Sequence, residues 1–300
     1  HDGSVVVDTN GTLNLTATGA VTLASGANLT ASSGGTVTYG GALSLNSGAT
    51  STLNASTLVV TGLLSNSGTM TMDDAGVTAT TFTNSGTLTF FDDSNDITGA
   101  FSNASGATLS VVGKSGNNDF LSKVTFASGF TNAGTIELDN FTNGSFGSNL
   151  TVTSGTLTNT GTIQSAQTTA SGTRSLTATL DNQGLLDVDF SLTLDKAAAS
   201  HVSSGTIDIA SGQTLTVSGN LLTNQSGGTI NLTSSTIGGT ATLANAGTIK
   251  VTGTGAINSA FSNASGGIVN IESQNIESAT LTIADGFTNA GLLELDDTNG

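Results

Sequence analysis

The sequence predicts an all-β protein, a right-handed parallel β-helix (β-solenoid) of about thirteen coils with roughly 22 residues per coil. Three observations predict this fold. Short runs alternate apolar with polar residues, a motif built on Asn and Gly recurs along the chain, and helix signals are nearly absent. Alternation over short runs is typical of strands. A unit of this size cannot bury its apolar face alone, whereas stacked units can.

The recurring motif places an apolar residue two positions before an Asn, then a Gly, then two apolar residues flanking a polar one. Segment 82–90 (FTNSGTLTF) is a clean copy, as are 64–72 (LSNSGTMTM) and 130–138 (FTNAGTIEL). Asn and Gly tolerate positive φ, so the Asn-x-Gly step predicts a tight corner between strands. The motif asparagines, which we expect to stack as a ladder of aligned corners, are Asn66, Asn84, Asn103, Asn132, Asn159, Asn182, Asn224, Asn245, Asn263 and Asn289.

The spacing of these asparagines sets the coil length. It ranges from 18 residues, between Asn66 and Asn84, to 42 residues, between Asn182 and Asn224. Segment 202–209 (VSSGTIDI) lies inside the longest interval and follows the motif without its Asn. That interval is therefore predicted to hold two coils.

Alternation also assigns the two faces of each strand. Inward positions should form apolar columns at the spacing of neighbouring parallel strands, about 4.8 Å. Outward positions carry mostly Thr and Ser, which suit strands and avoid the repulsion of charges stacked coil upon coil. The predicted core ladder, in which motif Leu residues fill the remaining places, comprises Phe82, Phe101, Phe130, Phe261 and Phe287.

Thr-x-Thr pairs raise a further possibility, a Thr ladder that orders water as an ice-binding surface does. Examples are 69–71 and 87–89. The abundance of Thr makes such pairs expected, and the unequal coil lengths predict against a uniform flat Thr face.

A longer period lies above the coil. FSNASG occurs at 101–106 and again at 261–266, and GFTNAG occurs at 129–134 and again at 286–291. The chain is thus expected to be a single β-solenoid segment of a longer array, with internal super-repeats at approximately 1–143 and 144–300. Duplication extends such a fold readily because each coil contacts only its neighbours.

Composition excludes several classes of protein. There is no Cys and no Pro, so disulfide scaffolds, Cys-ligated metal sites and Pro-rich fibres are excluded. Five Lys and Arg against 21 Asp and Glu give a net charge of −16, which predicts no nucleic-acid partner. No apolar run approaches the ~20 residues of a membrane helix, so no direct membrane insertion is expected.

The chain resembles a known group of proteins in three respects: its Asn-x-Gly-Thr-Ile/Leu units, its Ser/Thr/Gly/Asn-rich composition, and segments such as 205–217 (GTIDIASGQTLTV). This group comprises the filamentous haemagglutinin-like adhesins and autotransporter passengers, giant secreted bacterial β-helix proteins. The resemblance implies a right-handed parallel β-helix, export through an outer-membrane β-barrel, and a role as adhesin, biofilm matrix fibre or surface filament. It places the chain at the bacterial cell surface, in the secreted fraction or in the extracellular matrix.

The function expected from these features is that of an extracellular structural or adhesive rod, not an enzyme. Its partners would be further copies of itself, in filaments or bundles, or surface glycans and cell receptors. The alternative is a carbohydrate-binding or polysaccharide-cleaving β-helix module. Recognition would then fall on the insertions at 113–119 and 140–147, and catalysis on Asp187, Asp189 and Arg174. The scattered cations favour a plain solvated strand face for these three residues.

One loop carries a candidate metal site. Residues 92–96 (DDSND) place side-chain oxygens at alternating positions, which suits calcium, with Asp92, Asp93 and Asp96 as ligands. The calcium loop of helix–loop–helix proteins would need Gly and Glu where this chain has Ile97 and Asn103. A plain acidic loop is the competing interpretation, and no other cofactor is expected.

Overall fold

The chain folds as a β-solenoid of about 12 turns with about 22 residues per coil, and its strands pair in parallel. A computed structural model describes residues 3–16, 18–92, 94–113, 121–140, 145–166, 171–273, 278–284 and 286–297. No helix occurs among these residues. Contacts divide the chain into unit 1 (His1–Thr156 with Thr168–Gly172) and unit 2 (Leu157–Gln167 with Thr173–Gly300). The division falls within β16 (Gly147–Asn159).

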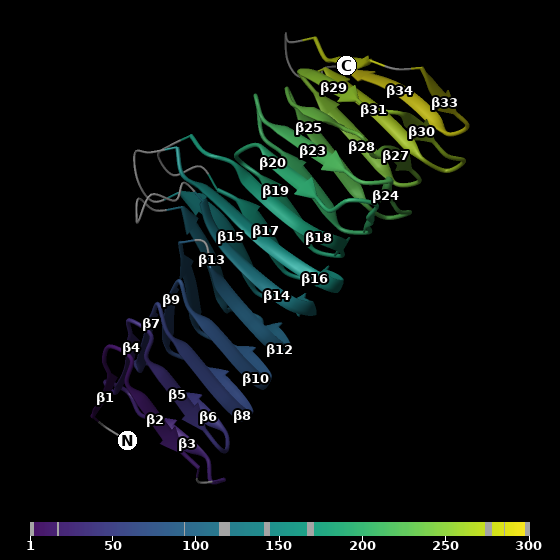
Figure 1. Ribbon diagram of the computed structural model, residues 1–300. Coiled ribbons are helices and arrows are strands. Elements are labelled where there is room, and N and C mark those ends of the chain that lie inside the picture. The colour runs from purple at the N-terminus through teal and green to yellow at the C-terminus, as the bar shows by residue number, and fades with distance from the viewer. Residues whose placement is uncertain are drawn as a thin grey trace. The chain divides into compact units, whose positions relative to one another are not determined.

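In unit 1 every coil contributes one strand to a first sheet and then a long bent strand, or two short strands, to the remaining wall (Figure 1). The first-sheet strands are β1 (Ser4–Val7), β4 (Asn28–Ser32), β7 (Thr50–Asn54), β9 (Thr69–Asp73), β11 (Thr87–Phe91), β13 (Thr108–Gly113) and β15 (Thr135–Asn140). The other wall holds β2 (Thr12–Leu15), β3 (Val21–Leu23), β5 (Thr36–Tyr39), β6 (Leu43–Leu45), β8 (Thr57–Asn66), β10 (Gly76–Asn84), β12 (Asn95–Asn103) and β14 (Leu121–Asn132).

Unit 2 repeats this plan with mostly shorter strands (Figure 1). Its first sheet holds β17 (Thr162–Ser165), β19 (Leu185–Val188), β22 (Thr206–Ile209), β25 (Thr229–Thr233), β28 (Thr248–Thr252), β31 (Ile268–Ser273) and β34 (Leu292–Asp297). Its other wall holds β18 (Arg174–Asn182), β20 (Leu192–Asp195), β21 (Ser200–Ser203), β23 (Thr214–Ser218), β24 (Leu221–Asn224), β26 (Thr236–Gly239), β27 (Thr242–Asn245), β29 (Thr254–Asn258), β30 (Phe261–Asn263), β32 (Thr280–Ile283) and β33 (Phe287–Asn289). Strands β21 and β22 form the Asn-free coil that the long interval predicted.

A ladder of buried side-chain amides joins successive coils. Asn84 shows the pattern: its Nδ2 donates to Oδ1 of Asn103 at 2.8 Å and to the carbonyl oxygen of Thr108 at 3.1 Å. Asn66 makes the same two bonds one coil earlier, at 2.9 Å each. In unit 2 the ladder runs from Asn245 through Asn263 to Asn289, with amide–amide distances of 2.8 Å. Each amide thus satisfies polar groups of the following coil inside the solenoid.

The role of the Asn-x-Gly corner differs from the one expected. None of the motif asparagines, all of which are described, has a positive φ. Gly86 has no positive φ either, but a Cβ there would collide with the carbonyl oxygen of Gly68 in the preceding coil. Glycine is therefore needed for close approach of neighbouring backbones rather than for its conformational freedom. A Cβ would also collide with the backbone of the preceding coil at six further corner glycines: Gly68, Gly134, Gly184, Gly205, Gly247 and Gly291.

Left-handed residues lie instead at the corner that follows the first-sheet strands β4, β7, β9 and β11. Ser33, Ala55, Asp74 and Asp92 occupy this corner in successive coils of unit 1, with φ between 43° and 57°. The corner stacks in register, since the Ala55 N–H donates to the Asp73 carbonyl and the Ser33 N–H to the Asn54 carbonyl. Two aspartates thereby occupy equivalent corner positions one coil apart, Asp74 partly exposed and Asp92 buried.

The Phe residues of the motif pack in the interior. Phe82 and Phe101 pair in register, and their ring centroids lie 5.2 Å apart. Phe130 follows at 5.0 Å from Phe101, and Phe126, which the motif does not include, lies 4.6 Å from Phe130. In unit 2 the rings of Phe261 and Phe287 stack at 5.8 Å, although Phe287 is 41% exposed.

The interior of unit 1 provides a test of the register. Phe130→Ala is expected to reduce the free energy of unfolding by about 3–5 kcal/mol, because the substitution empties a ring site that two other rings contact. Thr135→Ala, on the outward side of β15, should change it by no more than about 0.5 kcal/mol. Urea denaturation followed by circular dichroism measures both. Equal losses for the two variants would show that the assigned register is wrong.

The amide ladder is interrupted at Ser203. Asn182 Nδ2 donates to the Ser203 hydroxyl at 3.1 Å, but the buried Oδ1 of Asn224 in the next coil has no hydrogen-bond partner among the described residues. An Asn at this position would accept from Asn182 and donate to Asn224. Ser203→Asn is therefore expected to stabilise unit 2 by about 1–2 kcal/mol, since an orphaned buried acceptor costs about that much.

Chemical denaturation measures this gain, with Ser65→Asn on the outward side of β8 as the control. The control should lie within about 0.5 kcal/mol of the wild type. A loss of stability in S203N would show that the ladder does not tolerate an amide in this coil.

Candidate functional site

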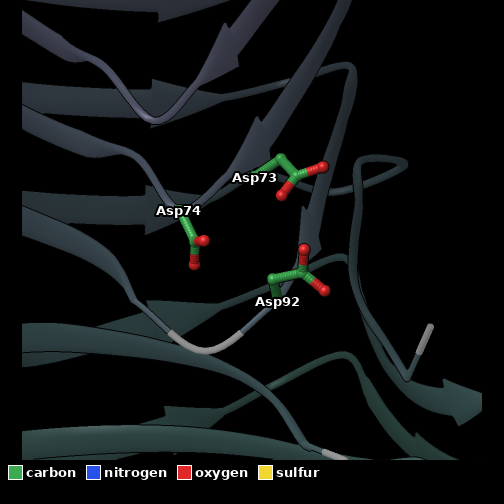
Figure 2. A group of neighbouring side chains, drawn as sticks. All are labelled: Asp73, Asp74 and Asp92. Carbon is green, nitrogen blue, oxygen red and sulfur yellow. The ribbon is translucent and has the colours of Figure 1, made fainter. Parts of the chain in front are cut away.

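An acidic corner lies at the ends of β9 and β11. It consists of Asp73, Asp74 and Asp92, and one carboxylate oxygen of each lies within 4.8 Å of those of the other two (Figure 2). Register explains the grouping: Phe91 pairs with Asp73, so Asp92 lies one coil above Asp74. The Asp74 carboxylate accepts the Ser94 N–H at 3.3 Å. Carboxylate oxygens are the ligands that calcium prefers.

This corner differs from the metal site that the sequence suggested. Asp92 groups with two aspartates of the preceding coil, whereas Asp96 lies within β12, exposed, and is not part of the group. Asp93 lies outside the described residues. A linear motif could not show this arrangement, because Asp73 and Asp92 are brought together by coil stacking. Calcium binding at the corner stays a prediction.

Aligned threonines form a second surface, on the outward side of the first sheet of unit 1. Thr69 pairs with Thr87, and Thr71 pairs with Thr89, so two Thr columns run side by side. The first column extends through Thr50, Thr108 and Thr135. The second column changes to Ser110 and Glu137 in the next two coils, so the Thr face is not uniform, but unequal coil lengths do not break the strand register of this unit. The additional residues of the long Asn103–Asn132 interval lie between β13 and β14, so the strand register continues undisturbed.

A third surface is a row of polar and charged side chains on the first sheet of unit 2. We call it the polar row: Asp187, Asp208, Asn231 and Lys250, which follow one another in register across β19, β22, β25 and β28. Asn231 Nδ2 donates to Asp208 Oδ1. Lys250 Nζ lies 2.7 Å from Glu272 Oε2. An open hollow of about 410 Å³ lies over the row, lined by Asp208, Asn231, Thr233, Lys250 and Thr252.

The polar row carries electrostatic strain at its acidic end. Partial burial raises the pKa of Asp187, and the neighbouring carboxylates of Asp189 and Asp208 raise it further. Gln164 offsets part of this repulsion, because its Nε2 lies 2.8 Å from Asp189 Oδ2 and 3.5 Å from Asp187 Oδ2. Like charges at coil spacing are the arrangement that most of this chain avoids.

The three residues suspected of catalysis do not share a surface. Asp187 and Asp189 lie on the outside, as expected from the alternation in 186–190. Arg174 is only 1% exposed and points inward with Leu176 and Leu180 of the same strand. Its guanidinium carbon lies 4.8 Å from the centroid of the Phe190 ring, a cation–π contact. A buried guanidinium in this position has no access to a polysaccharide.

His201 is a buried residue that the motif missed. It occupies the core position that pairs with Leu222, and its side chain is 0% exposed. Its Nδ1 accepts the Leu180 N–H at 3.2 Å. Burial lowers the pKa of His201, so the imidazole is neutral at pH 7. His201 therefore serves as a core residue. Of the two insertions suggested for recognition, at 113–119 and 140–147, residues 114–119 and 141–144 lie outside the described residues.

Comparison with known proteins yields one structural match. No family model matches the chain, and no curated protein matches it. A solved structure, the crystal structure of a TibC-catalyzed hyper-glycosylated TibA55-350 fragment, is similar over 98% of this chain and 98% of that chain, with 16% sequence identity and a TM-score of 0.42. A similarity of this size supports no statement about function.

No helix long and apolar enough to cross a membrane occurs among the described residues.

The acidic end of the polar row should make stability depend on pH. Because the folded-state pKa of Asp187 lies above the ordinary value of 3.8, the folded chain binds this proton more readily than the unfolded chain, and stability falls as pH rises from 3.8 through the folded-state pKa. Asp187→Asn removes the charge. It is expected to raise the urea midpoint relative to wild type at pH 7 and to have little effect at pH 3, where the carboxyl group is protonated in both states.

Asp195→Asn, at the exposed end of β20, is the control for the removal of one negative charge, and its urea midpoint at pH 7 should rise less than that of D187N. A lower midpoint for D187N at pH 7 would show that the Asp187 carboxylate stabilises the sheet.

Proposed function

We propose that the chain is an extracellular structural and adhesive segment of a bacterial surface or matrix protein. The fold supports this proposal, because coils that satisfy one another's amides and carbonyls form a stiff scaffold which holds side chains at fixed spacing. The resemblance of the repeat motif to secreted bacterial adhesins and autotransporter passengers agrees with it. The role is passive and geometric: the scaffold presents surfaces to other copies, to cells or to matrix.

The observation that carries the proposal is the paired Thr columns of unit 1. Among the described residues, the hydroxyls of Thr69, Thr71, Thr87 and Thr89 make no hydrogen bond with another protein group. Their methyl and hydroxyl groups form a regular, uncharged surface on a protein whose net charge is −16. Such a surface lets one copy approach another, or a cell surface, where the remainder of the molecule is repelled.

A non-catalytic role is part of the proposal. Three features support it. Arg174 lies in the interior, and Gln164 donates hydrogen bonds to the carboxylates of Asp187 and Asp189. His201 is buried, so this potential general base cannot reach a substrate. No observation on the described residues favours polysaccharide cleavage.

Adhesion is tested with beads that carry the purified chain. The wild type is expected to make beads cluster with one another or adhere to cultured epithelial cells and bacterial matrix. The double variant Thr71→Glu and Thr89→Glu places two carboxylates on the Thr columns, and should reduce the clustered or adherent fraction at least tenfold, because the added charges have the sign of the net charge of −16.

The matched control is Thr193→Glu with Thr216→Glu, a pair of partly exposed threonines in register on β20 and β23. It should leave adhesion unchanged. Wild-type beads that neither cluster nor adhere would contradict the proposed function. Equal losses of adhesion in both double variants would show that the Thr columns do not mediate it.

A further inference from the structure

The polar row departs from the rule that governs the other outward positions. Outward residues of the first sheets are mostly Thr, whereas four successive coils of unit 2 place Asp187, Asp208, Asn231 and Lys250 in one column. Lys250 is one of only five Lys and Arg in the chain. This concentration of charge and amide groups coincides with a hollow of about 410 Å³, a volume within the range of small-ligand sites, about 300–1,000 Å³.

The row retains hydrogen-bonding capacity of both kinds. Lys250 uses one of its three donors on Glu272 and keeps 42% of its side chain exposed. Asp208 accepts from Asn231 through one oxygen, and its second oxygen has no protein donor among the described residues. Thr233 and Thr252 line the side of the hollow, with their hydroxyl oxygens 3.4 Å apart. An acceptor, Asp208, therefore lies on one side of Asn231 and a donor, Lys250, on the other, while the two hydroxyls lie alongside.

This inventory selects a class of ligand. A ligand with vicinal hydroxyls can donate to the carboxylates and accept from the ammonium within one ring, and hydrogen bonds to charged groups are the stronger kind. An anionic ligand is disfavoured by Asp187 and Asp208 and by the net charge of −16. The row also lacks the triple carboxylate grouping that a metal ion needs, which among the described residues occurs only at Asp73, Asp74 and Asp92.

We propose that the polar row of unit 2 is a binding site for neutral saccharides. A sugar ring lies in the hollow, donates hydroxyl protons to Asp208, and accepts from Lys250 Nζ, while Asn231 and the two threonines fix its orientation. A sugar hydroxyl that donates to Asp208 also offsets the repulsion between its carboxylate and that of Asp187. This inference rests on the proposed adhesive function and names the ligand class for one of its surfaces.

The test is a binding titration of the purified chain with cellohexaose, mannohexaose and galactohexaose, followed by calorimetry, with hexagalacturonate as the anionic comparator. At least one neutral hexasaccharide is expected to bind, and hexagalacturonate is expected to bind at least tenfold more weakly. Asn231→Ala removes the centre of the row. Thr233→Val replaces only a hydroxyl with a methyl group and keeps the side-chain shape and the β-branch. A loss of binding in this variant is therefore not caused by a folding defect.

Both variants should weaken binding of the neutral saccharide at least tenfold while the thermal midpoint stays close to that of the wild type. Asn54→Ala, on the first sheet of unit 1, and Thr193→Val, on β20, are the matched controls and should bind as the wild type does. Absence of binding by all three neutral saccharides, preference for hexagalacturonate, or unchanged binding by N231A and T233V would each overturn the assignment. The bead assay separates the two proposals, since beads that cluster or adhere without saccharide binding would leave the adhesive function intact.

Discussion

The buried amide ladder is the interaction on which the rest of the molecule depends. Every motif Asn in a continuous part of the ladder donates to the amide oxygen of the next Asn and to a backbone carbonyl of the next coil, as Asn84 does with Asn103 and Thr108. An amide inside an apolar interior is costly unless its groups are satisfied, and this pattern satisfies them only when successive coils stand in strict register. Register, once fixed at one corner, fixes the strands that follow.

Register in turn decides which residues meet on the outside. Parallel strands that pair without slippage bring equivalent positions of successive coils into columns. Where these outward positions hold Thr they form the Thr columns of unit 1, and where they hold charged and amide residues they form the polar row of unit 2. Coil lengths differ: the interval that ends at Asn84 has 18 residues, and the interval that ends at Asn132 has 29. The first-sheet strands of these coils still pair residue for residue. Extra residues lie between strands, where the ladder does not constrain them, and the surfaces remain regular.

The acidic corner shows how this scaffold assembles groups that are distant in the chain. Asp74 and Asp92 occupy the same left-handed corner in adjacent coils, and Asp73 is the last strand residue before it. The sequence motif around residues 92–96 indicated a calcium loop within one segment, because a linear motif offers only neighbours in sequence. Stacking instead supplies neighbours one coil away, and Asp96 lies within a strand, outside the group.

The sequence by itself determined the fold class, the coil length, the strand alternation and the inward Phe positions, because these depend on local periodicity and on a motif that recurs at nearly regular intervals. It also marked the Asn-free coil at residues 202–209. Only the tertiary structure decided that the corner glycines serve close backbone approach, that His201 and Arg174 lie inside, and that Asp187, Asp208, Asn231 and Lys250 form one row. Those features arise from pairing between coils, and the pairing of one coil with the next depends on backbone geometry at the corners. Composition and spacing do not encode that geometry for any single residue.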